Sequence, residues 1–145
     1  SAEADIFDAH LLALDDPAVV PKYAKPGDAG MDLTAISCEV DDRRGQAHYR
    51  FGLAFEIPEG YVGLIFPRSS IVRRTCSLAN AVGVIDSGYR GEVTAVFTLH
   101  GEDFYAVGER IAQLVVVPFA HCEIEETDDL SETERGDGGY GSTGQ

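Results

Sequence analysis

Large apolar residues recur at every second position in several short segments of this chain. In the clearest run, Tyr49–Ile57, they alternate with polar or smaller residues. This is the period of a strand with one buried face, and helical spacing fits it poorly. Four more short segments are rich in β-branched, aromatic or aliphatic residues: Phe7–Leu14, Tyr61–Phe66, Val93–Leu99 and Ile111–Phe119.

Glycine and proline separate these segments at the short intervals typical of sandwiches and barrels. The pattern therefore predicts an antiparallel all-β domain. One short helix is predicted over Ser70–Thr75, directly after Pro67–Ser69. The chain has 145 residues, of which 44% are hydrophobic, and this is enough for one domain with one core. We expect that domain to span residues 1–134 and a flexible arm to occupy residues 135–145.

The formal net charge of −14 bears on the kind of partner. Proteins that bind nucleic-acid polymers present a basic face to the phosphates, so we expect no such partner. A small phosphorylated ligand stays possible. All the cations except Lys22 and Lys25 are arginines, which suit bidentate phosphate contacts.

Cellular location and cysteine chemistry follow from the same composition. No apolar run approaches the length of a membrane span, and the first ten residues lack the features of a secretory signal. We therefore expect a soluble, cytoplasmic protein with no membrane partner. The three cysteines, Cys38, Cys76 and Cys122, are odd in number and far apart. We predict that they are small core residues rather than a disulfide framework or a metal site.

The last residues form a glycine-rich segment behind Arg135. Its five glycines allow close backbone approach to an anion, Ser142 and Thr143 add hydroxyl donors, and Tyr140 offers a ring face. These groups suit a nucleotide's phosphate chain and base. The alternative is a frayed glycine and serine terminus, although that has no need of Arg135 or Tyr140. An acidic run, Glu123–Glu134, precedes the segment and is predicted to be a solvated connector.

Five segments stand in a distinctive order along the chain. They are Ala29–Leu33 (AGMDL), Pro67–Ser70 (PRSS), Asn80–Val93 (NAVGVIDSGYRGEV), Arg110–Gln113 (RIAQ) and Arg135–Gly144 (RGDGGYGSTG). The series resembles the trimeric dUTPase family, whose five motifs it matches in order. The resemblance implies hydrolysis of dUTP to dUMP and pyrophosphate, with Mg²⁺ on the triphosphate. It also implies an all-β, jelly-roll-like barrel of the dUTPase type with one short helix.

Assembly is part of the same expectation. In the family a homotrimer holds three active sites that are shared between subunits, and the C-terminal arm closes over the site. The resemblance therefore implies that a monomer of this chain is inactive. It also implies that dUMP serves thymidylate synthesis and that uracil is kept out of DNA.

Asp86 resembles the family's catalytic carboxylate. That group orients and activates the water that attacks the α-phosphorus. Water is a poor nucleophile, and a carboxylate within hydrogen-bond reach accepts its proton as the new bond forms. The alternative is that Asp86, Ser87 and Gly88 only form a turn between strands.

Other positions match the family's nucleoside pocket. Tyr89 corresponds to a ring that lies under the deoxyribose and excludes a 2′-hydroxyl group, although a lone tyrosine is often only a core or interface residue. The resemblance implies contacts with uracil or deoxyribose for Asn80, Val84, Ile85, Asp86, Tyr89 and Tyr140.

The phosphate contacts implied by the resemblance involve two interior motifs and the arm. They are Arg68, Ser69, Ser70, Gln113, Arg135, Ser142 and Thr143. Such donors neutralise charge that would repel an attacking water. Alternatively, the PRSS segment is a helix cap and Gln113 an ordinary strand residue. Asp32 matches the carboxylate that touches Mg²⁺ through water, the ion being held mainly by substrate phosphates.

One position departs from the family pattern. Gly88 stands where the family usually has aspartate, which moves the motif toward that of the dCTP deaminases, relatives with a similar barrel. Deamination needs a glutamate to shuttle protons, and Val96 stands at the aligned position. A third alternative is a catalytically idle barrel that serves as a binding module. The presence of Asp86, Arg68, Gln113 and the complete arm argues against it.

Overall fold

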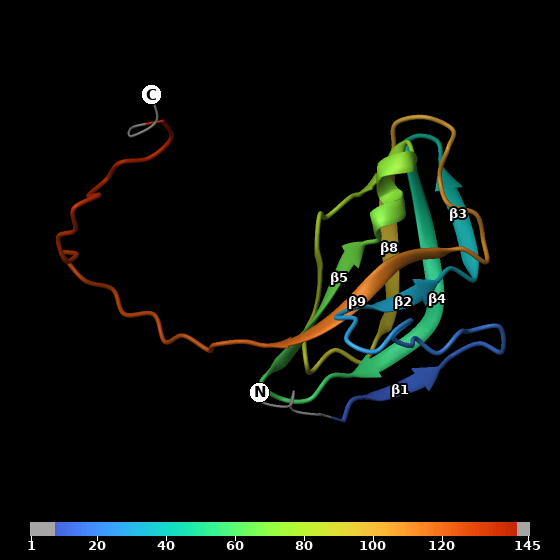
Figure 1. The fold of residues 1–145 in the computed structure, drawn as a ribbon, viewed down its shortest axis with the longest axis horizontal. Helices are drawn as coiled ribbons and strands as arrows, with labels where there is room; N and C mark the ends of the chain where they lie inside the picture. Colours follow the sequence, from blue (N-terminus) through green and yellow to red (C-terminus); the bar gives the residue numbers. More distant parts are fainter. Residues whose placement is uncertain (1–7, 142–145) are drawn as a thin grey trace.

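The computed structural model describes residues 8–141 of the chain. Figure 1 shows a body of strands from which the C-terminal segment runs out as an extended tail. Within residues 8–141 the elements are β1 (His10–Ala13), β2 (Met31–Thr34), β3 (Ser37–Asp41), β4 (Gln46–Glu56), β5 (Tyr61–Pro67), the 3₁₀ helix η1 (Ser69–Arg73), β6 (Cys76–Leu78), β7 (Gly83–Ile85), β8 (Glu92–Leu99) and β9 (Arg110–Pro118).

The strands form two sheets. One sheet has the order β1-β4-β8-β6, with β3 also paired to β4, and the other has the order β2-β9-β5-β7. Every strand pair is antiparallel. The prediction of an antiparallel all-β domain is therefore confirmed.

The barrel expected from the resemblance is not closed. Within the described part of the chain the two sheets share no ladder of hydrogen bonds, so they form an open sandwich. The strands β6 and β7, which end the two sheets, are three residues long, and the chain turns between them through Ala81 at a φ of 61°. Because β6 and β7 are so short, they end before either can form hydrogen bonds with a strand of the other sheet.

The longer strands lie where the hydrophobic pattern predicts them. The segments centred on β4, β5, β8 and β9 are confirmed, and the described part of the first predicted strand contains β1. The predicted helix is a single short 3₁₀ helix that begins and ends earlier than expected, at Ser69 and Arg73. It stops there because the chain becomes extended at Arg74, whose N–H still donates to the carbonyl of Ile71.

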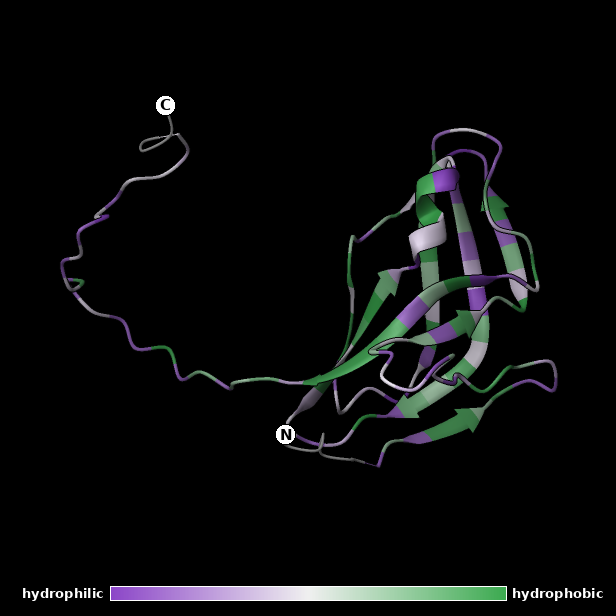
Figure 2. Cartoon of the chain, viewed as in Figure 1, coloured by the Kyte–Doolittle hydropathy of each residue, from purple (hydrophilic) through white to green (hydrophobic). Residues whose placement is uncertain are grey.

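The core lies between the sheets and is built from inward-facing residues of the longer strands. Figure 2 shows hydrophobic and hydrophilic residues alternating along these strands. At the centre Tyr49, Phe97 and Tyr105 pack edge to face, with ring centroids 5.4 and 5.7 Å apart. The hydroxyl of Tyr49 donates to the carbonyl of Tyr105 at 2.6 Å. Burial raises the pKa of Tyr49, so this hydroxyl stays protonated and remains a donor.

A glycine bulge bends the longest strand. The register of β4 against β8 shifts between Arg50 and Ala54, and Gly52 inside this shift has a φ of +69°. On one side of the bulge β4 pairs with β3, and on the other side it pairs with β1. The positive φ favours glycine because a side chain there strains the backbone.

The C-terminal segment carries no strand or helix between residues 119 and 141. Its acidic run is exposed, and Ile124 and Leu130 are 91% and 82% accessible, which agrees with a solvated connector. Cys76 is buried, as predicted, and Cys38 is half-buried. The core prediction for Cys122 is wrong, because this residue lies exposed on the connector, beyond the last strand. No helix in the described residues is long and apolar enough to cross a membrane.

Candidate active site

A cavity of about 420 Å³ collects side chains from three of the five sequence motifs. Its lining includes Asp32, Arg68, Ser69 and Gln113. Strand pairing explains why they meet. In the sheet Asp32 on β2 lies opposite Gln113 on β9, which lies opposite Phe66 on β5, and the chain reaches Arg68 two residues later.

Asp32 is held between two guanidinium groups at this cavity. Its Oδ1 accepts from Nε of Arg68 at 2.8 Å, and its Oδ2 lies 3.5 Å from Nη1 of Arg110. Arg68 also donates to the carbonyl of Arg110 at 3.2 Å. The side chains of Arg68 and Asp32 are only 24% and 21% exposed. Two cations share one anion, so the cluster is net positive in an acidic chain and suits an anionic ligand.

Gln113 is fixed in the same cavity. Its Nε2 donates to the carbonyl of Pro67 at 2.9 Å, which ties β9 to the residue just before Arg68. Its Oε1 lies against Gly30, where a Cβ atom would overlap it. Glycine at position 30 therefore permits the close approach that holds the Gln113 amide in place.

A second cavity, of about 490 Å³, lies beside β7. It is lined by Arg44, Gln46, His48, Ile65, Leu78, Ala79, Asn80, Gly83, Val84, Ile85, Thr94, Ala95 and Val96. The predicted nucleoside residues Asn80, Val84 and Ile85 share this cavity with Val96. Among the described residues no aspartate or glutamate lines it, so an apolar ring system with a few polar edges suits it better than proton-transfer chemistry at a carboxylate.

Asp86 comes directly after β7 and lies in an exposed turn. The N–H of Tyr89 closes this turn by donating to the carbonyl of Asp86 at 3.1 Å. No hydrogen bond or ion pair to the Asp86 carboxylate is found within residues 8–141. A carboxylate at that position is open to a ligand or to water. The Gly88 position is also open, since a Cβ built there meets no atom within 4 Å.

Tyr89 is held by its own neighbours. Its hydroxyl donates to the carbonyl of Glu92 at 3.0 Å. Its ring lies directly against Gly91, where a Cβ atom would overlap the hydroxyl end of the ring. Tyr89 is 45% exposed, so part of its ring remains accessible to a ligand. Glycine at position 91 is what allows the hydroxyl end of the ring to approach the backbone so closely.

Comparison with known proteins identifies the family. The dUTPase family model matches residues 16–144, which is most of the chain. The chain belongs to the dUTPase family. A curated relative, the deoxyuridine 5'-triphosphate nucleotidohydrolase of Cutibacterium acnes, is 47% identical over 133 residues, covering 88% of this chain and 87% of the relative. The family expected from the motifs is therefore confirmed.

Solved dUTPases share the fold. The dUTPase of Staphylococcus bacteriophage 80alpha, solved with dUPNHPP, superposes with a TM-score of 0.82 at 28% identity, covering 95% of this chain and 99% of its own. A mutant dUTPase from phage phi11 of S. aureus, described with a structural Mg(II) ion, has a TM-score of 0.73 at 23% identity, covering 85% and 98%. At that identity the second likeness shows the fold alone.

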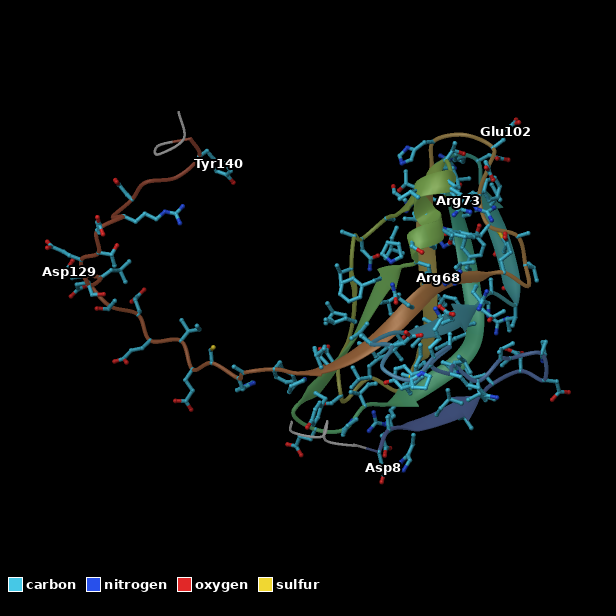
Figure 3. All side chains as sticks on the ribbon, in the orientation of Figure 1. Asp8, Arg68, Arg73, Glu102, Asp129 and Tyr140 are labelled. Carbon is cyan, nitrogen blue, oxygen red and sulfur yellow. The ribbon has the colours of Figure 1, made fainter. Side chains whose placement is uncertain are left out.

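The structure brings only some of the predicted residues of this dUTPase-family chain together. Asp32 lies on β2 and the segment leading to Asp86 on β7, and these strands are the opposite edges of one sheet. Arg135 and Tyr140 are exposed on the tail, where Arg135 donates to the carbonyl of Gly138 at 2.8 Å. Figure 3 shows Tyr140 well away from Arg68. Ser142 and Thr143 lie outside the described residues.

Three charged residues in or beside the first cavity were not predicted from the sequence. Lys25 and Asp28 line it, and Arg110 contacts Asp32 at its edge. Arg110 opens the RIAQ motif, and Lys25 and Asp28 closely precede the AGMDL motif. Proximity to a motif was therefore the available signal.

Ser70 and Arg74 turn away from this cavity. The hydroxyl of Ser70 lies 2.8 Å from that of Tyr105. Arg74 pairs with Glu109 at 2.7 Å and with Asp103 at 3.3 Å. A hydrogen bond from the backbone N–H of Ala106, together with the Arg74 guanidinium, holds the pKa of Glu109 below its ordinary value. The Arg74–Glu109 pair is thus ionised at neutral pH.

The oxygen donors of the first cavity suit magnesium. Asp28, Asp32 and the amide of Gln113 supply the oxygen ligands that Mg²⁺ prefers. Nowhere in residues 8–141 do three or more histidine, cysteine, aspartate or glutamate side chains gather as a metal site. The donor set therefore fits an ion held mainly by a phosphorylated ligand.

Replacing Gly30 with alanine tests the packing around Gln113. The new methyl group displaces the Gln113 amide and breaks its hydrogen bond to Pro67, so we expect the free energy of unfolding to fall by about 1–3 kcal/mol. Urea denaturation at a fixed protein concentration measures the change. Gly88→Ala is the matched control, because its site is open and its stability should change by less than about 1 kcal/mol. Equal stability of the two variants would refute the packing argument.

Proposed function

We propose that this chain is a dUTP diphosphatase, which hydrolyses dUTP to dUMP and pyrophosphate. The observation that carries the proposal is the cavity in which Asp32, Arg68, Ser69 and Gln113 meet, in a chain of the dUTPase family. The product dUMP then serves thymidylate synthesis, and removal of dUTP keeps uracil out of DNA. The charge of −14 favours a small nucleotide over a nucleic-acid polymer as the partner.

The phosphate chain binds in the first cavity. Arg68 keeps N–H donors beyond the one that it gives to Asp32, and Ser69 is exposed beside it. These donors neutralise the phosphate oxygens and lower the repulsion that an attacking water meets. Gln113, which is held by Pro67 and Gly30, orients the substrate's phosphate groups near the scissile bond. Mg²⁺, when bound, would supply further charge neutralisation, and Asp32 would hold it through water.

The uracil and deoxyribose occupy the second cavity and its rim. Asn80, Val84 and Ile85 form the pocket for the base. The ring of Tyr89, whose hydroxyl end packs on Gly91, lies under the sugar and leaves no room for a 2′-hydroxyl group. Asp86 accepts a proton from the water that attacks the α-phosphorus, with its carboxylate free of protein partners in the described residues.

A complete site requires more than one copy of the chain. The cavity with Arg68 and the turn with Asp86 lie at opposite edges of one sheet, so one copy does not present both groups to the same phosphate. We therefore infer a homotrimer with shared sites. The arm, residues 135–145, brings Arg135, Tyr140, Ser142 and Thr143 to a site on a neighbouring subunit and closes over the nucleotide.

Deamination of dCTP is the weaker proposal. Val96 lies in the second cavity, and no carboxylate lines that cavity in the described residues. Pyrophosphate and ammonia release from dUTP, dCTP, dTTP and UTP, measured in parallel with Mg²⁺, separates the two activities. Pyrophosphate from dUTP alone supports the proposal. Ammonia from dCTP would overturn it, and no product from any of the four would favour the binding module.

Asp86→Asn should abolish turnover while leaving binding intact. The amide cannot accept the proton of the attacking water, so we expect the rate of dUTP hydrolysis to fall by roughly two to four orders of magnitude. Affinity for a non-hydrolysable dUTP analogue, measured by calorimetry, should stay close to that of the wild type. The control is Glu59→Gln, which removes an exposed carboxylate from a turn away from both cavities. Normal turnover by Asp86→Asn removes the assigned base.

Deleting residues 135–145 should leave a folded protein with little activity. Arg135 and Tyr140 are exposed, and the hydrogen bonds that Arg135 and Gly136 donate stay within the tail. We therefore expect an unchanged unfolding transition and a fall in kcat/KM of roughly a hundredfold, since contacts to base and phosphate are lost. Full activity of the truncated chain would contradict a role for the arm. Tyr140→Phe, which keeps the ring, serves as the control for stacking.

Gly91→Ala should weaken discrimination against UTP. The added methyl group displaces the Tyr89 ring, so the space for a 2′-hydroxyl group opens. We expect the ratio of kcat/KM for dUTP to that for UTP to fall by roughly tenfold or more. Gly88→Ala, at an open position next to Tyr89, should keep the ratio. An unchanged ratio in Gly91→Ala would show that the Tyr89 position does not set sugar selectivity.

A further inference from the structure

The phenol of Tyr105 is buried next to the segment that carries Arg68 and Ser69. Its side chain belongs to the core and is only 2% exposed. Its hydroxyl reaches the hydroxyl of Ser70 at 2.8 Å. A buried tyrosine hydroxyl needs a hydrogen-bond partner, and Ser70 is the side-chain partner found here. The contact joins the core directly to the residue that follows Ser69.

Tyr105 itself is held firmly. The hydroxyl of Tyr49 donates to its backbone carbonyl at 2.6 Å. The ring of Phe97 packs against the Tyr105 ring with centroids 5.7 Å apart and an interplanar angle of 68°. Ring and backbone are thus both fixed by core residues. The Tyr105 hydroxyl is a rigid point to which a less stable segment can be attached.

The helix η1, by contrast, has little to hold it in place by itself. It is one short 3₁₀ helix with no buried residue and no side-chain cap at Arg68. So short a 3₁₀ helix has little intrinsic stability. Its position comes from contacts with the rest of the fold: the half-buried Ile71 packs against the core, and Ser70 provides a hydrogen bond near the start of η1.

Arg74 attaches the other end of η1 to the same loop. Its guanidinium carbon lies 4.6 Å from the centroid of the Tyr105 ring, and it pairs with Glu109 at 2.7 Å. The next residue, Thr75, donates its N–H to the carbonyl of Asp103 at 2.7 Å. Both ends of η1 are therefore fixed to the loop between β8 and β9, with Tyr105 common to both attachments.

We propose that Tyr105 is a positioning residue for phosphate binding, and the proposal rests on the function proposed above. Through Ser70 it fixes the start of η1, so that Arg68 and Ser69 face the cavity that contains Asp32 and Gln113. Tyr105 does not line that cavity. Its contribution is to hold the donors in place before the ligand arrives, which favours binding by lowering the ordering entropy.

The variant Tyr105→Phe tests this role. It keeps the ring, its packing on Phe97 and the Arg74 contact, and it removes only the hydroxyl. We expect KM for dUTP to rise by roughly three- to tenfold, as expected for the loss of one hydrogen bond, with a smaller change in kcat. Ser70→Ala removes the other partner of this hydrogen bond and tests the same contact if Tyr105→Phe folds poorly. The double variant Tyr105→Phe/Ser70→Ala should have a KM no higher than that of the single variant with the higher KM, because both substitutions remove the same contact.

Tyr49→Phe is the matched control. It also removes a buried hydroxyl from the same aromatic cluster, but this hydroxyl contacts the Tyr105 carbonyl and not Ser70. We expect it to lower the midpoint of thermal unfolding and to raise KM by less than Tyr105→Phe does, because the hydroxyl that contacts Ser70 remains. A wild-type KM in Tyr105→Phe, or equal KM values in Tyr49→Phe and Tyr105→Phe, would overturn the positioning role. So would additive effects of Tyr105→Phe and Ser70→Ala.

The proposed function and the positioning role can be disproved independently of each other. If the wild-type chain does not hydrolyse dUTP, the proposed function falls. The affinity of the first cavity for inorganic triphosphate is then measured by calorimetry in the wild type and the same variants. Binding that is weaker in Tyr105→Phe and Ser70→Ala than in Tyr49→Phe would still support the positioning role. Equal binding in all of them would end it.

Discussion

The register of β9 is the constraint on which the candidate site depends. This strand pairs with β2 on one side and β5 on the other, and that register places Gln113 between Asp32 and Phe66. Because side chains alternate between faces along a strand, a slip of one residue would turn Gln113 away from the cavity. The position of Arg68, two residues beyond Phe66, depends on the same register.

The charge around the first cavity of this dUTPase-family chain differs in sign from the charge of the chain as a whole. The chain as a whole is strongly acidic, yet its first cavity holds a net positive cluster in which Arg68 and Arg110 share one carboxylate. Partial burial strengthens these interactions compared with the same charges in water. A small anion meets a favourable field in the cavity, whereas the exposed acidic connector repels extended polyanions. This division agrees with the small anionic substrate of the proposed function.

The long elements were predictable because their pattern is local. The segment Tyr49–Ile57 alternates over enough residues to identify a strand by period alone. The strands β2, β3, β6 and β7 have three to five residues and were not predicted, since so few positions show no clear period. The four-residue β1 was found because it lies within the longer apolar segment Phe7–Leu14. The open sandwich in place of a closed barrel, and the exposure of Cys122, follow from where strands end, which the period does not determine.

The sequence by itself determined which chemical groups the chain carries and in what order, and these were enough to indicate the family. It also placed Arg68, Ser69, Gln113 and Asp32 among the candidates. Only the tertiary structure decided that these four share one cavity, that Asp86 lies at the opposite edge of the sheet, and that Ser70 faces Tyr105. The physical reason is that strand register and core packing join residues far apart in the chain, and no local pattern of polarity encodes such contacts.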